Sequence, residues 1–143
     1  MTDLNDDVRK LVTAAIVASP YARLLGIEAE ELAVDSVRLR LSYRPDVTTF
    51  GDTIHGGAIS SLVDIAATGA CWASHQLPPG SRGTTIGFSI NFLAAGRGQD
   101  LVATARVIQR GRSLCVCEVD VHGKDGAAVA RATVTYKLSG KPV

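Results

Sequence analysis

The fold is decided by residues 57–75, which read GAISSLVDIAATGACWASH. Apolar residues occur in every turn of this segment, so a helix built from it has hardly any polar face and is expected to be buried almost all round. Small residues are abundant too, and Gly69 lowers helix propensity by roughly 1 kcal/mol. Such a helix is suited to a sheet that wraps around it, or to a second copy of itself at close range.

Residues 36–43 alternate with the period of two that is typical of a half-buried strand. Residues 27–32 precede them as a weakly patterned hairpin partner. Four further strands are predicted after the helix, at 85–94, 100–109, 113–121 and 127–138. On the first of these, the apolar side chains that share a face are Ile86, Phe88, Ile90 and Phe92.

The start of the chain predicts a helix over residues 3–19, followed by Pro20 and a short turn or loose helical piece at 21–26. Residues 44–54 are expected to form a loop. The resulting order predicts an α+β fold for a single domain over residues 1–143. In it, a long curved antiparallel sheet of about six strands wraps around one central buried helix, an arrangement favoured over a sandwich.

Composition and charge exclude several functions. The formal net charge of +1 gives no general attraction for nucleic acid or for an anionic membrane. Asp3, Asp6 and Asp7 stand where a secretory signal has basic residues and an apolar run. No stretch approaches the roughly 18 apolar residues that span a bilayer. The sequence therefore predicts a cytoplasmic protein.

The three cysteines are interpreted as buried structural thiols, and no metal is expected. Cys115 and Cys117 are two residues apart on a predicted strand, so they face the same way and do not form an ordinary disulfide. Without a nearby histidine or further cysteine in the sequence, this pair is also a poor zinc site. Cys71 lies in the apolar helical pattern.

Asp64 is the residue of the buried helix that stability does not explain. Its neighbours one turn away are small or hydroxylated and include no lysine or arginine. Burying an ionised carboxylate without a partner costs several kcal/mol. Two interpretations remain open. Asp64 either lies on a narrow polar strip with Ser60, Ser61 and Thr68, or it has a catalytic role.

The segment His55-Gly56-Gly57 leads into the same helix. Glycines allow a ligand to approach the backbone, and the first-turn N–H groups of a helix have no intrahelical acceptors. These donors, backed by the helix dipole, suit a developing oxyanion. Alone, the motif is also explained as a glycine-rich loop that starts a helix. Combined with Asp64, it indicates a catalytic site.

Helix geometry separates the two parts of this site. Gly57 and Asp64 are seven residues apart, about 10 Å along the axis at roughly 1.5 Å per residue. One carbonyl group cannot lie within about 3 Å of both. If both serve one reaction, they come from different subunits whose helices run antiparallel. The sequence therefore predicts a two-fold dimer with two composite sites.

Residues 51–64, GDTIHGGAISSLVD, resemble the hotdog acyl-CoA thioesterases of the phenylacetate-degradation (PaaI-like) type. In that family His-Gly-Gly precedes a helical acid at the spacing seen here. The resemblance covers nearly the whole chain. It implies the hotdog fold, hydrolysis of an acyl-CoA to a free acid and CoA, a homodimer paired into a homotetramer, and no metal or cofactor.

The resemblance also implies roles for single residues. Asp64 is expected to act as nucleophile or as general base on water, a choice that the family leaves open. The Gly57 N–H is expected to polarise the thioester carbonyl across the dimer interface, with His55 holding the carbonyl or the loop. Thr85 matches a position where these enzymes carry a serine or threonine that orients water or the acid, although alternation with Ile86 places it off the main apolar face.

One position departs from the family pattern. Many members carry an asparagine several residues before the histidine, whereas residues 47–50 here are Val-Thr-Thr-Phe. Thr48 or Thr49 is expected to substitute as a weaker hydrogen-bonding group.

Further substrate contacts are expected from residues around the motif and from arginines. The phosphates of CoA suit arginine forks, although each arginine is equally well explained as a solvated residue of a turn. The expected contacts are Gly56, Ser61, Arg82, Arg110 and Arg112.

Two other functions fit part of this pattern. One is a non-catalytic acyl-CoA-binding or regulatory protein of the same fold. The other is a hotdog dehydratase, which requires an acid–histidine pair at a different spacing that His75 and His122 do not obviously supply. A serine hydrolase is disfavoured because Ser60 and Ser61 have no patterned base.

Overall fold

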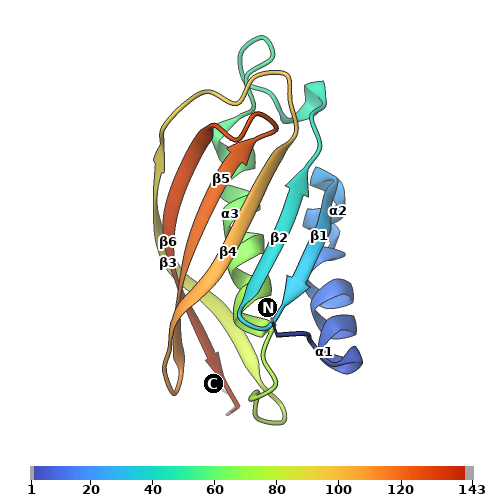
Figure 1. Cartoon of the computed structure of the whole chain (residues 1–143), viewed down its shortest axis with the longest axis vertical. Helices are drawn as coiled ribbons and strands as arrows, with labels where there is room; N and C mark the ends of the chain where they lie inside the picture. The colour runs from blue at the N-terminus through green and yellow to red at the C-terminus, as the bar shows by residue number, and fades with distance from the viewer. Residues whose placement is uncertain (1, 141–143) are drawn as a thin grey trace.

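The computed structural model describes residues 2–140 and has the element order predicted above (Figure 1). Six strands form one antiparallel sheet in the order β1-β2-β4-β5-β6-β3. Between β2 and β4 the chain forms the helix α3 (Gly56–Trp72) and then the strand at the opposite edge. The strands are β1 (Ile27–Ala33), β2 (Ser36–Leu41), β3 (Arg82–Phe92), β4 (Leu101–Arg110), β5 (Leu114–Gly123) and β6 (Ala128–Ser139).

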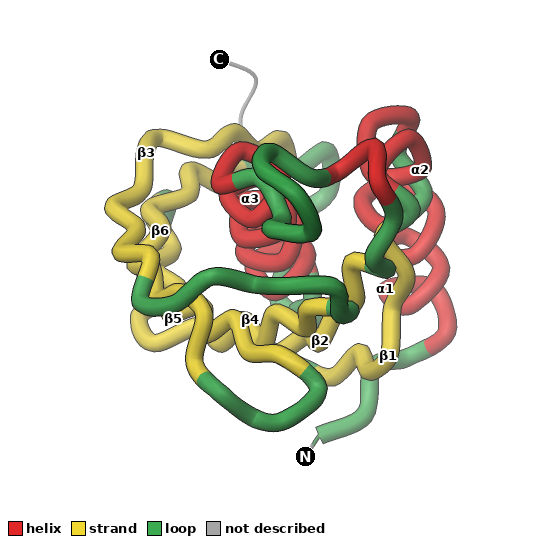
Figure 2. Tube along the Cα trace, turned by 90° about the horizontal axis from the view of Figure 1, so that it is seen from above, coloured by secondary structure: helices red, strands yellow, loops and turns green. Residues whose placement is uncertain are grey.

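Helix α3 lies in the concave face of the curved sheet, as the end-on view shows (Figure 2). It packs against β2, β4, β5 and β6. Its buried residues are Ala58, Ile59, Leu62, Val63, Ala66, Ala67, Gly69, Ala70 and Cys71. The prediction of one apolar helix wrapped by an antiparallel sheet is therefore confirmed. None of the helices in residues 2–140 is both long and apolar enough to cross a bilayer.

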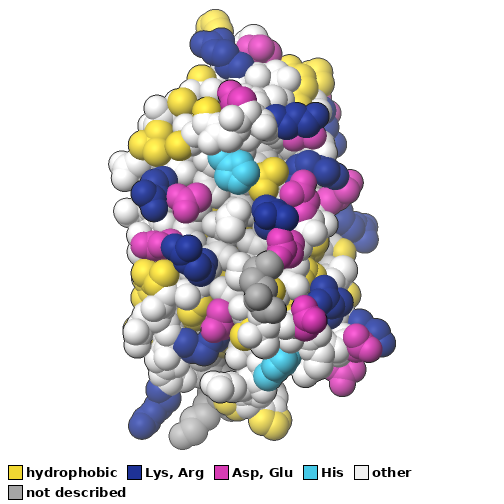
Figure 3. All heavy atoms as spheres, in the orientation of Figure 1, with side chains coloured by type: hydrophobic (Ala, Val, Ile, Leu, Met, Phe, Trp, Pro, Cys, Tyr) yellow, Lys and Arg dark blue, Asp and Glu magenta, His cyan; other side chains and the backbone are white. Residues whose placement is uncertain are grey.

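The two faces of the sheet differ in polarity. The inner side chains of β2 (Val37, Leu39 and Leu41) are buried, as the alternation predicted. The outer face carries interspersed charges of both signs (Figure 3). These include an Arg131–Asp120 pair at 2.7 Å between neighbouring strands. Exposed pairs of this kind stabilise a protein by about 1 kcal/mol or less, so the inner face provides most of the stability.

The N-terminal segment is less regular than the single helix predicted over residues 3–19. Leu4 is buried, and the side chain of Asn5 accepts a hydrogen bond from the Val8 N–H, so the helix begins later than predicted. Gly26, with φ of 75°, ends the last helical piece in the left-handed conformation. The pieces are α1 (Asp6–Leu11), the π-helical η1 (Val12–Val17) and α2 (Pro20–Leu25).

Strand β3 corrects the predicted position of Thr85. The register with β6 shifts between Thr85 and Gly87, which makes Ile86 an extra residue in the manner of a β-bulge. Thr85 is therefore paired with Tyr136, and Phe88 with Val134, both inward-facing residues of β6. Because cross-strand partners lie on the same face, Thr85 faces α3 rather than solvent.

Candidate active site

Asp64 and Thr85 form the central contact of the site. Asp64 lies near the middle of α3 and is partly buried. The Thr85 hydroxyl donates a hydrogen bond of 2.7 Å to Asp64 Oδ1. The bulge at Ile86 makes this contact possible, because it turns Thr85 toward the helix. The carboxylate is thus held in one orientation by a neutral donor, and within residues 2–140 Oδ2 accepts no hydrogen bond.

His55 is the N-cap of α3 and occupies donors of the first turn. Its carbonyl accepts from the N–H groups of Ala58 and Ile59 at 3.0 and 3.1 Å. Its Nδ1 accepts from the Gly57 N–H at 2.8 Å. The Gly57 N–H, expected to be free, is therefore capped by the preceding side chain. A neutral imidazole that accepts at Nδ1 carries its proton on Nε2. Because His55 is exposed, its Nε2–H is a donor open to solvent beside the Gly57 N–H.

An open groove of about 380 Å³ lies beside the start of α3. Gly56 lines the groove, and a Cβ added there would lie 3.4 Å from the ring of Phe92. Thr49 lines the groove, whereas Thr48 is the C-cap of the short 3-10 turn η2 (Pro45–Val47), and its hydroxyl donates to Pro45 O at 2.7 Å. Of the two threonines predicted to replace the missing asparagine, Thr49 is thus the one that reaches the groove.

Ser61 is engaged within the protein. Its hydroxyl donates to Gly57 O at 2.9 Å, one turn earlier in α3. It also forms a 2.9 Å hydrogen bond with the Tyr21 hydroxyl from α2. Sequence reasoning missed Tyr21, because the two residues are 40 positions apart and nothing in the pattern of 21–26 pointed to α3.

A second polar pair joins the last residue of α3 to β6, the strand that pairs with β3. The Trp72 Nε1–H donates to the Tyr136 hydroxyl at 2.8 Å. Burial raises the pKa of Tyr136, and the hydrogen bond from Trp72 partly offsets this effect. Tyr136 is the β6 partner of Thr85, so the pair supports the part of β3 that holds Asp64. In the sequence, the only sign of this pair is the place of Tyr136 among the alternating residues of the last predicted strand.

The three candidate phosphate-binding arginines differ in availability. Arg110 forms a 2.7 Å ion pair with Asp35 and donates to Cys71 O at 3.0 Å. Arg112 is exposed at the β4–β5 turn, and Arg82 is exposed at the start of β3, in a groove that Lys137 also lines. Arg110 thus holds the end of α3 to the sheet, whereas Arg82 and Arg112 are exposed and Lys137 is half-buried.

The family model of the Thioesterase superfamily matches residues 51–130 of the chain. The medium/long-chain acyl-CoA thioesterase YigI of Salmonella typhimurium is 32% identical over 132 residues, covering 83% of this chain and 85% of that protein. Human acyl-coenzyme A thioesterase 13 is 28% identical over 141 residues, covering 96% of this chain and 99% of that protein.

Solved structures agree on the fold. The Escherichia coli PaaI protein from the phenylacetic acid degradation operon has a TM-score of 0.83 at 22% identity, covering 94% of this chain and 95% of that one. The resemblance found in residues 51–64 is thus confirmed by sequence and by structure. The chain belongs to the thioesterase superfamily, with the hotdog fold, and is a hydrolase that acts on thioester bonds.

Proposed function

We propose that this chain hydrolyses acyl-CoA thioesters to free acids and CoA, with Asp64 as the catalytic carboxylate. The observation that carries the proposal is the 2.7 Å hydrogen bond from the Thr85 hydroxyl to Oδ1 of Asp64, which lies on the buried helix α3. A carboxylate there has one oxygen fixed and the other available. The curated relatives named above, which are acyl-CoA thioesterases, support CoA esters as the substrate class.

Asp64 acts either as a general base or as a nucleophile, and both mechanisms give the same products. As a general base, it takes a proton from water while the water oxygen attacks the acyl carbon. The tetrahedral intermediate then collapses and expels the CoA thiolate, which receives a proton. As a nucleophile, the carboxylate itself attacks and forms a mixed anhydride, which water hydrolyses after CoA has left. In both cases Thr85 keeps Asp64 Oδ1 in place.

The developing oxyanion is held at the start of α3 from the partner subunit. The donors proposed for it are the Gly57 N–H and the Nε2–H of His55. The thioester oxygen either shares the Gly57 N–H with His55 Nδ1 or replaces His55 Nδ1 as its acceptor. One carbonyl cannot reach both ends of a seven-residue span of helix. At each site, the carbonyl that Asp64 of one subunit acts on is therefore held by donors from the α3 helix of the partner subunit.

The exposed edge of the sheet supports this dimer. Strand β3 is an edge strand, and apolar side chains on it and just beyond it are exposed, which is unusual for a monomer surface. They are Ile86, Phe88, Phe92 and Leu93, with exposed fractions between 38% and 58%. Pairing of two β3 edges covers them and brings the two α3 helices together. We propose further pairing into a tetramer, and Arg82, Arg112 and Lys137 as contacts for the CoA phosphates.

The proposed activity is tested by incubating the purified protein with acyl-CoAs of short, long and aromatic acyl groups and a thiol reagent. At least one is expected to release CoA at a rate proportional to protein concentration. Binding of one acyl-CoA with no release from any of them would instead identify a non-catalytic binding protein.

Replacing Thr85 with alanine is expected to lower kcat by roughly 10- to 100-fold, because it removes a hydrogen bond to a charged group. Thr85→Ser keeps the hydroxyl and is expected to retain most of the activity. The measurement is steady-state CoA release for both variants. Equal losses in the two would mean that the methyl group, and not the hydroxyl, is what matters.

A further inference from the structure

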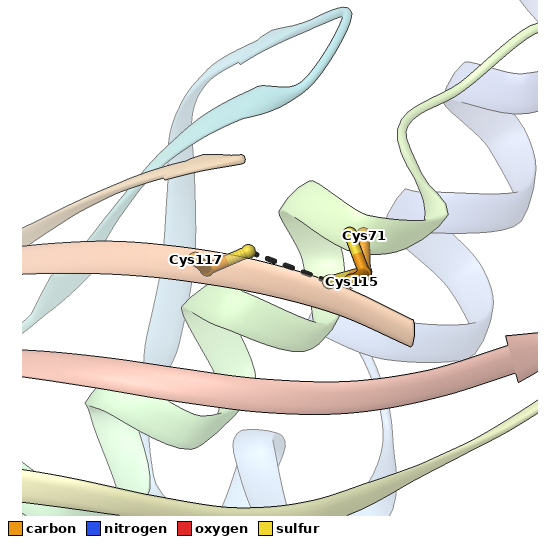
Figure 4. A group of neighbouring side chains, drawn as sticks. All are labelled: Cys71, Cys115 and Cys117. Carbon is orange, nitrogen blue, oxygen red and sulfur yellow. Dashed lines mark hydrogen bonds between the residues drawn. The ribbon is translucent and has the colours of Figure 1, made fainter. Parts of the chain in front are cut away.

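The three cysteines of the chain form one cluster in the core. Cys71 near the end of α3 and Cys115 and Cys117 on β5 point toward one another (Figure 4). The three sulfur atoms lie within 4.8 Å of one another, and Cys71 Sγ and Cys117 Sγ are 3.4 Å apart. All three residues are buried, with at most 2% of their surface exposed. The pair Cys115 and Cys117 thus has the further cysteine that the sequence pattern lacked.

We propose that Cys71, Cys115 and Cys117 form a three-thiolate site for a thiophilic divalent cation of the class of Zn²⁺ and Cd²⁺. Thiolate sulfur is a ligand that such ions prefer. At a metal–sulfur distance of about 2.3 Å, sulfurs around one ion are spaced by roughly 3.8–4.0 Å. The Cys71–Cys117 spacing of 3.4 Å is shorter than this value and the other two spacings are at most 4.8 Å, so each sulfur needs to move by less than about 1 Å to surround an ion.

The surroundings of the cluster suit such an ion. Three thiolates and a divalent cation carry one net negative charge, and the guanidinium of Arg110, which is paired with Asp35, lies beside the cluster and donates to Cys71 O at 3.0 Å. A small cleft of about 50 Å³ at the β4–β5 turn is lined by Cys115, Arg110 and Arg112. Of the three cysteines, Cys115 is thus the one that borders this cleft. Each thiol that binds releases its proton to solvent, so binding is weaker at low pH.

The site is distinct from the proposed catalytic carboxylate. Cys71 is seven residues beyond Asp64 on α3, about 10 Å along the axis. An ion there links the end of α3 to β5 and stabilises the fold without reaching the thioester. The chain's own sulfurs therefore give it a metal-dependent stability in addition to its activity.

The test is a titration of the phosphine-reduced full-length protein with Cd²⁺, followed by the ultraviolet thiolate-to-cadmium charge-transfer band. The expected result is saturation at one ion per chain, competition by Zn²⁺, and a rise in Tm in the presence of either ion. Absence of the band at ion concentrations well above that of the protein would overturn the proposal, whatever any variant does.

Variants locate the site. Cys115→Ala and Cys117→Ala are each expected to weaken Cd²⁺ binding by at least tenfold. Loss of a residue that only hydrogen-bonds to a metal ligand already weakens binding by about 10- to 100-fold. Val119→Ala is the matched control, because Val119 is the next inward-facing core residue of β5 and has no sulfur. It is expected to lower Tm and to keep the band. An unchanged band in the double variant Cys115→Ala, Cys117→Ala would place the ion elsewhere and refute the site.

Discussion

An Asp64→Asn protein is expected to release CoA about 10²- to 10⁴-fold more slowly than the wild type, with its fold intact. The amide is close to the carboxylate in size, and its oxygen still accepts the hydrogen bond that Thr85 donates at 2.7 Å. It cannot, however, take a proton from water or attack the acyl carbon. The measurement is kcat with the best substrate of the panel, together with Tm and far-ultraviolet circular dichroism.

The matched control for this substitution is Asp120→Asn. Asp120 lies on β5 and pairs with Arg131 on the outer face of the sheet, away from α3. The same chemical change there is expected to leave kcat near the wild-type value, since an exposed ion pair contributes about 1 kcal/mol or less to stability. Wild-type turnover by Asp64→Asn would remove Asp64 from the mechanism and leave the polar-strip interpretation standing.

The arrangement of the core was predictable from sequence because two periods dominate it. The alternation of Val37, Leu39 and Leu41 fixes which face of β2 is buried, and the unbroken apolar pattern of 57–75 allows α3 only an interior position. Asp64 also stood out on physical grounds, since a carboxylate among small and apolar residues needs a partner or a purpose. These signals are local, so one sequence is enough to carry them.

The features that sequence reasoning missed depend on contacts between distant residues. The bulge at Ile86 reverses the facing of Thr85, and nothing in local alternation indicates where a register shifts. The hydrogen bond of Tyr21 with Ser61 and the approach of Cys71 to Cys117 each join segments at least 40 residues apart. The capping of Gly57 by His55 is local, but it depends on a side-chain rotamer that the motif does not specify.

Subunit complementation is the prediction that most directly tests the composite site. Asp64→Asn and His55→Ala are each expected to be impaired as homodimers, since each damages both sites. In a heterodimer of the two variants, one site combines both defects and the other has neither, provided that Asp64 and His55 of one site come from different chains. The purified heterodimer, isolated with two different affinity tags, is therefore expected to have about half of the wild-type activity.

A second heterodimer provides the control. Thr85 donates to Asp64 within the same chain, so a heterodimer of Asp64→Asn and Thr85→Ala has one defect in each of its sites. It is expected to show no more than the mean activity of its two parents. If the Asp64→Asn and His55→Ala heterodimer behaves in the same way, then Asp64 and the start of α3 serve the site of their own chain. A carbonyl would then have to meet groups about 10 Å apart on one helix, and the oxyanion donor would have to be sought closer to Asp64 than Gly57.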